Sequence, residues 1–242
     1  MNNPGKENPL EEGQVLLFNK PLYWTSFDLV NKVRIMIRES TGIRKIKVGH
    51  AGTLDPLADG LMILCTGKAT RRAEEFTGLD KEYVAEIYLG KTTPSFDLET
   101  GTDGEYPISH ITRALAEEAL GSFLGRQEQV PPVFSAKLIE GKRAYEFARK
   151  GIETEIKPVN VVFREIELLD FNLPVIRVRI LCSKGTYIRA FARDIGKALG
   201  SGAHLSALTR TAIGPYRTEN AIDLEKFNIL LQKMKQTGKF SV

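Results

Sequence analysis

The chain has 242 residues, 42% of them hydrophobic and 26% charged, and its formal net charge is +4. This composition is typical of a globular protein and argues against a disordered chain. The mildly positive charge permits a polyanionic partner without requiring one. No apolar run approaches the roughly 18 residues of a membrane-spanning helix, and the polar N-terminal segment has no apolar signal sequence. We therefore expect a soluble, cytoplasmic protein without a membrane partner.

The hydrophobic pattern predicts strands and helices that interleave irregularly, without the steady alternation of a doubly wound sheet. Strands are expected at residues 15–18, 61–65, 81–89, 159–171, 175–183 and 207–210. Helices are expected from Thr25 or Ser26, from 67, over 110–121, after a turn at 183–189, and over 222–235. Residues 1–12 have the composition of a disordered tail. The prediction is an α+β fold with a mixed, mainly antiparallel sheet flanked by helices, in one domain of residues 13–242.

The two cysteines, Cys65 and Cys182, both lie in apolar, strand-like runs. Neither belongs to a CxxC motif or to a cysteine–histidine spacing that would hold a metal. Buried, reduced thiols are the simplest interpretation. We expect no metal site.

The stretch GHAGTLDPLADG, residues 49–60, combines three glycines with a proline and leads into the apolar run 61–65. Glycine and proline disfavour regular structure, so the stretch predicts a tight loop beside a core strand. Asp55 lies within it, and a carboxylate held on a rigid loop is suited to chemistry. Aspartate before proline is also common in ordinary turns, and on this stretch alone the turn is favoured.

The chain lacks the sequence templates of common hydrolases and nucleotide-binding proteins. It has no HExxH or GxSxG motif, and a P-loop at residues 62–69 fails because Met62 replaces the first glycine and Ala69 follows Lys68. A single carboxylate can instead act as a covalent nucleophile if an arginine keeps it ionised. An aromatic ring nearby suits a planar substrate such as a nucleobase.

Residues 126–151 contain the Pro131-Pro132 pair and then a basic segment, 142–150, in which aromatic residues alternate with cations. This pattern predicts either a helix of a nucleic-acid clamp or a surface helix whose aromatic side chains pack inward. The pattern alone does not separate the two.

Five segments, in order along the chain, resemble the motifs of the TruB family of tRNA pseudouridine synthases. The loop 49–60 resembles the catalytic motif, and the others are Lys20-Pro21, residues 81–83, residues 183–189, and residues 202–205 with Leu208 and Arg210. The resemblance implies a pseudouridine-synthase-like fold and an isomerase (an intramolecular transferase). Its reaction would convert the T-loop uridine at tRNA position 55 to pseudouridine, without cofactor or metal.

The same resemblance implies roles for individual residues. Asp55 would attack the uridine, at the base or at the sugar, while Tyr83 stacks on the flipped base and Arg189 pairs with the Asp55 carboxylate. The residues that would line or support the pocket are Lys20, Tyr187 and Leu208. His50 would help to hold the T-loop open, although a purely structural histidine is an equal alternative.

The resemblance also identifies residues 126–151 as an RNA-clamping insertion. Basic side chains that can neutralise phosphates are Lys45, Lys47, Lys68, Arg71, Arg143 and Arg149, and we expect about half of them to be ordinary surface residues. The family motif usually has threonine at the position of Ala51, and often at Asp59.

Many relatives carry a C-terminal PUA-type RNA-binding domain, and we expect none in a chain that ends at residue 242. The expected partner is the T-arm of tRNA, bound by a monomer. A tRNA-binding or tRNA-folding protein without catalysis is the alternative function.

Overall fold

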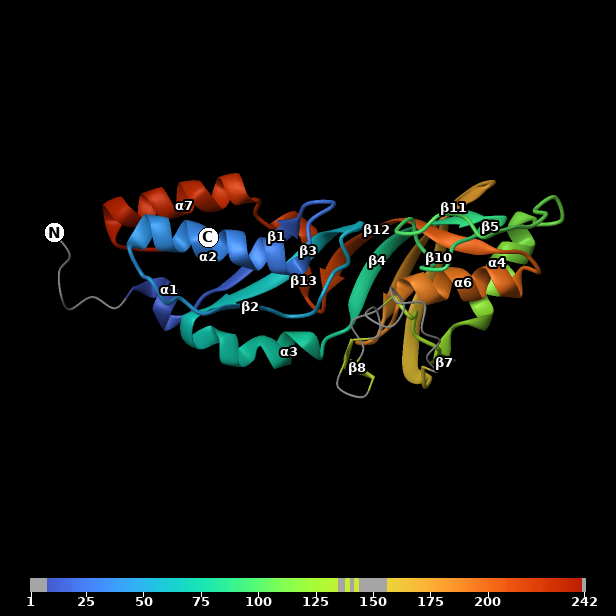
Figure 1. Ribbon diagram of the computed structural model, residues 1–242, viewed down its shortest axis with the longest axis horizontal. Coiled ribbons are helices and arrows are strands. Elements are labelled where there is room, and N and C mark those ends of the chain that lie inside the picture. Colours follow the sequence, from blue (N-terminus) through green and yellow to red (C-terminus); the bar gives the residue numbers. More distant parts are fainter. Residues whose placement is uncertain (1–7, 135–137, 140–141, 144–155, 241–242) are drawn as a thin grey trace. The chain divides into compact units, whose positions relative to one another are not determined.

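The computed structural model describes residues 8–134, 138–139, 142–143 and 156–240 (Figure 1). The chain forms two compact units. Unit 1 comprises residues 1–79 and 209–242, and unit 2 comprises residues 80–208. Strand β12 (Ala203–Ile213) passes from unit 2 into unit 1.

Unit 1 is built around strand β3 (Ala58–Thr66), which is buried along nearly its whole length. Strands β1 (Val15–Lys20) and β2 (Val48–His50) both pair with it antiparallel, and β12 is its neighbour on the sheet path. The short strand β13 (Tyr216–Arg217) pairs with the end of β12. The remaining elements of unit 1 are α1 (Pro9–Glu12), α2 (Ser26–Thr41), η1 (Gly67–Arg72), α3 (Ala73–Thr77), η2 (Thr218–Asn220) and α7 (Leu224–Thr237).

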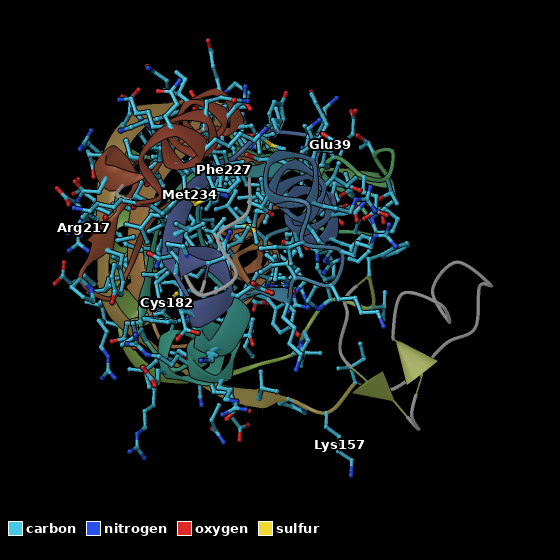
Figure 2. The ribbon with its side chains drawn as sticks, turned by 90° about the vertical axis from the view of Figure 1, so that its left-hand side faces the viewer. Glu39, Lys157, Cys182, Arg217, Phe227 and Met234 are labelled. Atoms are coloured by element: carbon cyan, nitrogen blue, oxygen red, sulfur yellow. The ribbon has the colours of Figure 1, made fainter. Side chains whose placement is uncertain are left out.

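Helix α2 begins where the sequence predicts. The Thr25 hydroxyl accepts from the Asp28 amide while the Asp28 carboxylate accepts from the Thr25 amide, which is a capping box. Gly42 ends the helix with φ +76°, a conformation that favours glycine. Helices α2 and α7 lie side by side (Figure 1). Figure 2 labels Phe227 and Met234 of α7, which are buried in this unit.

Unit 2 contains an antiparallel sheet in the order β12-β4-β11-β10-β7. These strands are β4 (Lys81–Leu89), β11 (Val175–Cys182), β10 (Val159–Asn172) and β7 (Gly125–Gln129). Among the described residues of this unit, helices α4 (Arg113–Ser122) and α6 (Ile188–Ala198) accompany the sheet, together with two small hairpins. The hairpins are β5 (Lys91–Thr92) with β6 (Gly104–Glu105), and β8 (Leu138–Ile139) with β9 (Lys142–Arg143). The predicted α+β class with a mainly antiparallel sheet is confirmed.

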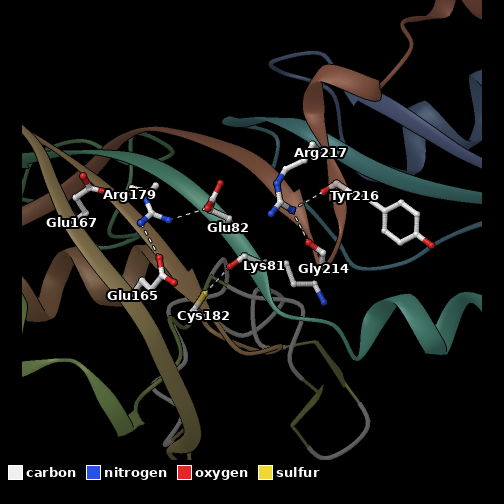
Figure 3. Close-up of polar contacts among 9 residues, drawn as sticks. All are labelled: Lys81, Glu82, Glu165, Glu167, Arg179, Cys182, Gly214, Tyr216 and Arg217. Atoms are coloured by element: carbon white, nitrogen blue, oxygen red, sulfur yellow. Dashed lines mark hydrogen bonds and ion pairs between the residues drawn. The ribbon is translucent and has the colours of Figure 1, made fainter.

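An ion-pair cluster joins three neighbouring strands of unit 2 (Figure 3). Arg179 of β11 contacts Glu82 of β4 at 3.0 Å, and Glu165 and Glu167 of β10 at 2.8 and 2.9 Å. The hydrogen bonds that Arg179 donates to Glu167 and Glu165 are the main causes that raise the pKa of Arg179. The cluster fixes side-chain pairing across three strands, although its partial exposure keeps its stabilisation modest.

Some local predictions are wrong. Residues 9–12 were assigned to a disordered tail but form α1, because the Asn8 side chain caps the helix and Leu10 is fully buried. The helix predicted from residue 67 does start there, as the 3-10 helix η1 that continues directly into α3. Lys142 and Arg143 belong to strand β9 and not to a basic helix. The rest of that segment, 144–150, lies outside the described residues.

Candidate active site

Asp55 lies in the loop between β2 and β3 of unit 1, and its side chain is partly exposed. The β2–β3 register pairs His50 with Leu64, and the Ala51 amide extends it by donating to the Ile63 carbonyl at 2.9 Å. The Ala58 amide donates to the Asp55 carbonyl at 3.1 Å, closing a turn before β3. Both ends of the loop are therefore held by backbone hydrogen bonds, as the glycine- and proline-rich sequence predicted.

Ser26, the first residue of α2, fixes the backbone immediately before Asp55. The Leu54 amide donates to the Ser26 hydroxyl at 2.8 Å, and that hydroxyl donates to the Leu54 carbonyl at 2.9 Å. Both residues are buried. Because one hydroxyl satisfies both backbone groups of Leu54, the approach to Asp55 has little conformational freedom.

Arg210 holds the same loop from β12. Its guanidinium is 1% exposed and donates to the carbonyls of Leu61, Thr53 and Gly52 at 2.7, 3.3 and 3.3 Å. Gly60 has φ +103°, and a Cβ there would lie 2.4 Å from the Arg210 carbonyl oxygen. The glycine thus allows β3 to approach Arg210 closely. In the sequence Arg210 is only part of a motif match, and nothing near it in the chain indicates that it holds this loop.

Lys20 adds a buried cation to unit 1. The residue is 0% exposed, and its ammonium donates to the carbonyls of Pro21 and Trp24 at 2.9 and 2.6 Å. Burial lowers the pKa of Lys20 to about 8, while the charges of Asp59 and Asp55 oppose this shift. At neutral pH Lys20 therefore carries a positive charge that acts on the Asp55 carboxylate.

The lowered pKa of Lys20 predicts a pH dependence of stability. The pKa of Lys20 is about 8 in the folded protein and has the ordinary value of 10.5 in the unfolded chain. Between these two pH values, Lys20 keeps its proton in the unfolded chain and has lost it in the folded protein. The unfolded state then binds more protons, so this group makes the free energy of unfolding rise with pH. Relative to Lys20→Met, the wild type should gain roughly 2 kcal/mol from pH 7.5 to 10. Urea unfolding followed by Trp24 fluorescence measures this, and parallel pH curves for the two proteins would contradict it.

His50 ends β2, directly before the loop. Burial is the main cause that lowers its pKa, with a smaller contribution from the Arg210 charge, and a backbone hydrogen bond at Gly52 opposes both. The imidazole is therefore mostly neutral at pH 7. Among the described residues, its Nδ1 atom is buried without a hydrogen-bond partner, as is Oδ1 of Asp59. The buried Nδ1 atom is compatible with both expected roles of His50, which are to help hold the T-loop open or to be a purely structural histidine.

The other predicted site residues lie in unit 2. Tyr83 of β4 is 9% exposed and stands opposite Ile180 of β11. Tyr187 precedes α6, and its amide and carbonyl both bond to the side chain of Gln129, at 2.8 and 3.1 Å. Leu208 is buried on β12. The side chain of Arg143 and the whole of Arg149 lie outside the described residues.

Arg189, the second residue of α6, has a partner that the sequence analysis missed. Its Nη1 lies 3.4 Å from Oδ2 of Asp97, and the two side chains are each 6% exposed. Oδ1 of Asp97 accepts from the Glu99 amide at 2.9 Å. Asp97 lies in the loop 92–106, in which Thr93 and Ser95 are also buried. No sequence signal separates Asp97 from the neighbouring loop acids, because its burial depends on the contact with α6.

Within the part of the chain that the structure describes, no group of three His, Cys, Asp or Glu side chains could hold a metal ion. No described helix is long and apolar enough to span a membrane. The arrangement in unit 1 is a carboxylate on a loop that a buried serine and a buried arginine fix, together with the charge of a buried lysine. Such an arrangement is suited to covalent catalysis or to charge stabilisation by one acid.

Comparisons with known proteins now identify the family. Residues 38–188 match the model of the TruB family pseudouridylate synthase N-terminal domain, and residues 189–240 match that of the tRNA pseudouridylate synthase B C-terminal domain. The chain belongs to the TruB family of pseudouridylate synthases. The resemblance found in the sequence is thereby confirmed, and so is the class of enzyme, an isomerase.

Individual TruB-family relatives are similar over most of the chain. The tRNA pseudouridine synthase B of Phocaeicola vulgatus is 61% identical over 217 residues, which is 90% of this chain and 92% of the relative. Among solved structures, one titled as a Cbf5-Nop10-Gar1 complex has a TM-score of 0.72 and 26% identity over 95% of this chain. An H/ACA RNP bound to a substrate RNA containing 2'-deoxyuridine has a TM-score of 0.68 and 25% identity. This chain spans 57% and 56% of those two chains.

Proposed function

We propose that this enzyme isomerises the T-loop uridine at position 55 of tRNA to pseudouridine, with Asp55 as the nucleophile. The main support for the proposal is the set of buried side chains around the Asp55 loop. Ser26 fixes the residue before Asp55. Arg210 holds the carbonyls of Gly52 and Thr53 in the loop and of Leu61 in β3, and Lys20 supplies a buried charge. The 61% identical relative named tRNA pseudouridine synthase B supports tRNA as the substrate.

The isomerisation is balanced without an oxidant or a cofactor. The bond between N1 of uracil and C1′ of the ribose breaks, and a bond between C5 and C1′ forms. The proton on C5 is released and N1 takes up a proton. Asp55 holds the fragment covalently in between, through the base or through the sugar, and both routes require the uridine to leave its stack first.

Two residues of unit 2 complete the proposal through the family resemblance. Tyr83 stacks on the flipped uracil, and Arg189 keeps the attacking carboxylate ionised. Tyr187 and Leu208 contribute to the pocket. We further propose that residues 13–242 act as one catalytic domain, and that residues 126–151, with Arg143 and Arg149, grip the T-arm. The solved relative bound to a substrate RNA supports an RNA partner.

The test is mass mapping of pseudouridine in an unmodified tRNA transcript incubated with the purified protein. We expect one pseudouridine, at position 55, and none in a transcript with cytidine at that position. A tRNA-binding protein without catalysis would bind the transcript and leave every uridine unchanged. Modification only at another position would contradict the proposed substrate site.

A further inference from the structure

The turn between β1 and α2 exposes apolar side chains beside the Asp55 loop. Leu22, Tyr23 and Phe27 are 43%, 75% and 64% exposed. Tyr23 also has φ +66°, in the left-handed region that a bulky residue rarely adopts. Because the Tyr23 ring is exposed, its burial cannot offset the free-energy cost of the unfavourable backbone conformation of Tyr23.

The backbone of the turn is nevertheless held firmly. The Lys20 ammonium donates to the carbonyls of Pro21 and Trp24, at opposite ends of the turn. The Tyr23 amide donates to the carbonyl of Pro56 at 2.8 Å. Pro56 directly follows Asp55, so the position of the Tyr23 backbone is tied to that of the proposed nucleophile.

A non-glycine residue with positive φ near a functional loop is an observation from which a function can be inferred. A tyrosine on a fixed backbone is a preorganised flat surface, since it loses little conformational entropy on binding. The reaction proposed above requires a uridine to leave its stack, which exposes the faces of the bases beside it. Such faces bind aromatic rings without regard to base identity.

We propose that the Tyr23 ring is a stacking platform for an unstacked nucleobase of the substrate RNA, next to the target uridine. The proposal rests on the proposed function and adds a contact that positions the RNA on unit 1. Tyr23 takes no part in the chemistry. The Tyr23 amide bonds to Pro56, the residue after Asp55, so the ring lies on a segment attached to the proposed catalytic loop. This favours an RNA base over a protein partner.

Tyr23→Gly distinguishes a role in RNA binding from a role in stability, because it should weaken RNA binding without lowering the melting temperature. Glycine adopts positive φ without strain and keeps the amide that donates to Pro56, so the melting temperature should stay the same or rise. Binding of unmodified tRNA, measured in an Asp55→Ala background to prevent turnover, should weaken about tenfold. Tyr23→Phe should retain wild-type affinity. Ile229→Ala on α7 removes a 49% exposed apolar side chain and should leave affinity unchanged.

A direct readout uses T-arm RNA with 2-aminopurine at each loop position in turn. We expect the fluorescence at one position to be quenched by the Tyr23 protein and not by Tyr23→Gly. Unchanged affinity and unchanged quenching in Tyr23→Gly would overturn the proposal, as would a fall in melting temperature that Tyr23→Phe does not rescue. The proposed function fails separately, if the wild type forms no pseudouridine at position 55.

Discussion

Replacing Asp55 with alanine is expected to reduce pseudouridine formation roughly 10⁴-fold or more and to leave the protein folded. The fold should survive because Ser26, Arg210 and backbone hydrogen bonds hold the loop. Release of tritium from C5-labelled uridine in tRNA measures turnover. Circular dichroism and Trp24 fluorescence report the fold.

Asp59→Thr is the matched control for Asp55. It removes a carboxylate from the same loop, with a residue that the family motif often has there. It should keep most of the turnover and, because Asp59 helps to raise the pKa of Lys20, make deprotonation of Lys20 easier. Full turnover by Asp55→Ala would refute the assignment of the nucleophile. Equal losses in both variants would indicate general damage to the loop.

Arg189→Ala is expected to lower the free energy of unfolding by about 3–5 kcal/mol and to abolish activity. The stability loss follows from the structure, since the variant leaves the buried carboxylate of Asp97 without its guanidinium. The activity loss follows from the proposed pairing with Asp55. Urea unfolding of unit 2 should be followed by circular dichroism, because the single tryptophan of the chain, Trp24, lies in unit 1.

Arg193 of the same helix is the control for Arg189. It pairs with Asp194 at 2.7 Å and lies over the Phe96 ring at 4.8 Å, and neither contact leaves a buried carboxylate behind when it is removed. Arg193→Ala should therefore cost less than Arg189→Ala, about 1–2 kcal/mol. The double variant Arg189→Ala/Asp97→Ala should recover part of the stability, but not the activity. An unchanged unfolding free energy in Arg189→Ala would show that the buried pair does not contribute as proposed.

The sequence alone was sufficient for features that depend on nearby residues. The candidate caps Thr25 and Ser26 predicted the start of α2, and the hydrophobic pattern of residues 81–89 predicted β4. The 49–60 motif predicted a tight loop around Asp55. These signals are contained within a few residues, where backbone geometry and hydrophobic period act directly.

Only the tertiary structure identified the groups that hold that loop. Ser26 and Leu54 are 28 positions apart, and Arg210 is 149 positions from Leu61. The pairing of Arg189 with Asp97 joins α6 to the loop 92–106, 92 positions away in the chain. A side chain's partner across such distances is set by how strands and helices pack, and no local pattern of residue types specifies it. The sequence thus determined where the acid lies in the chain, while packing decided which distant side chains make its loop rigid.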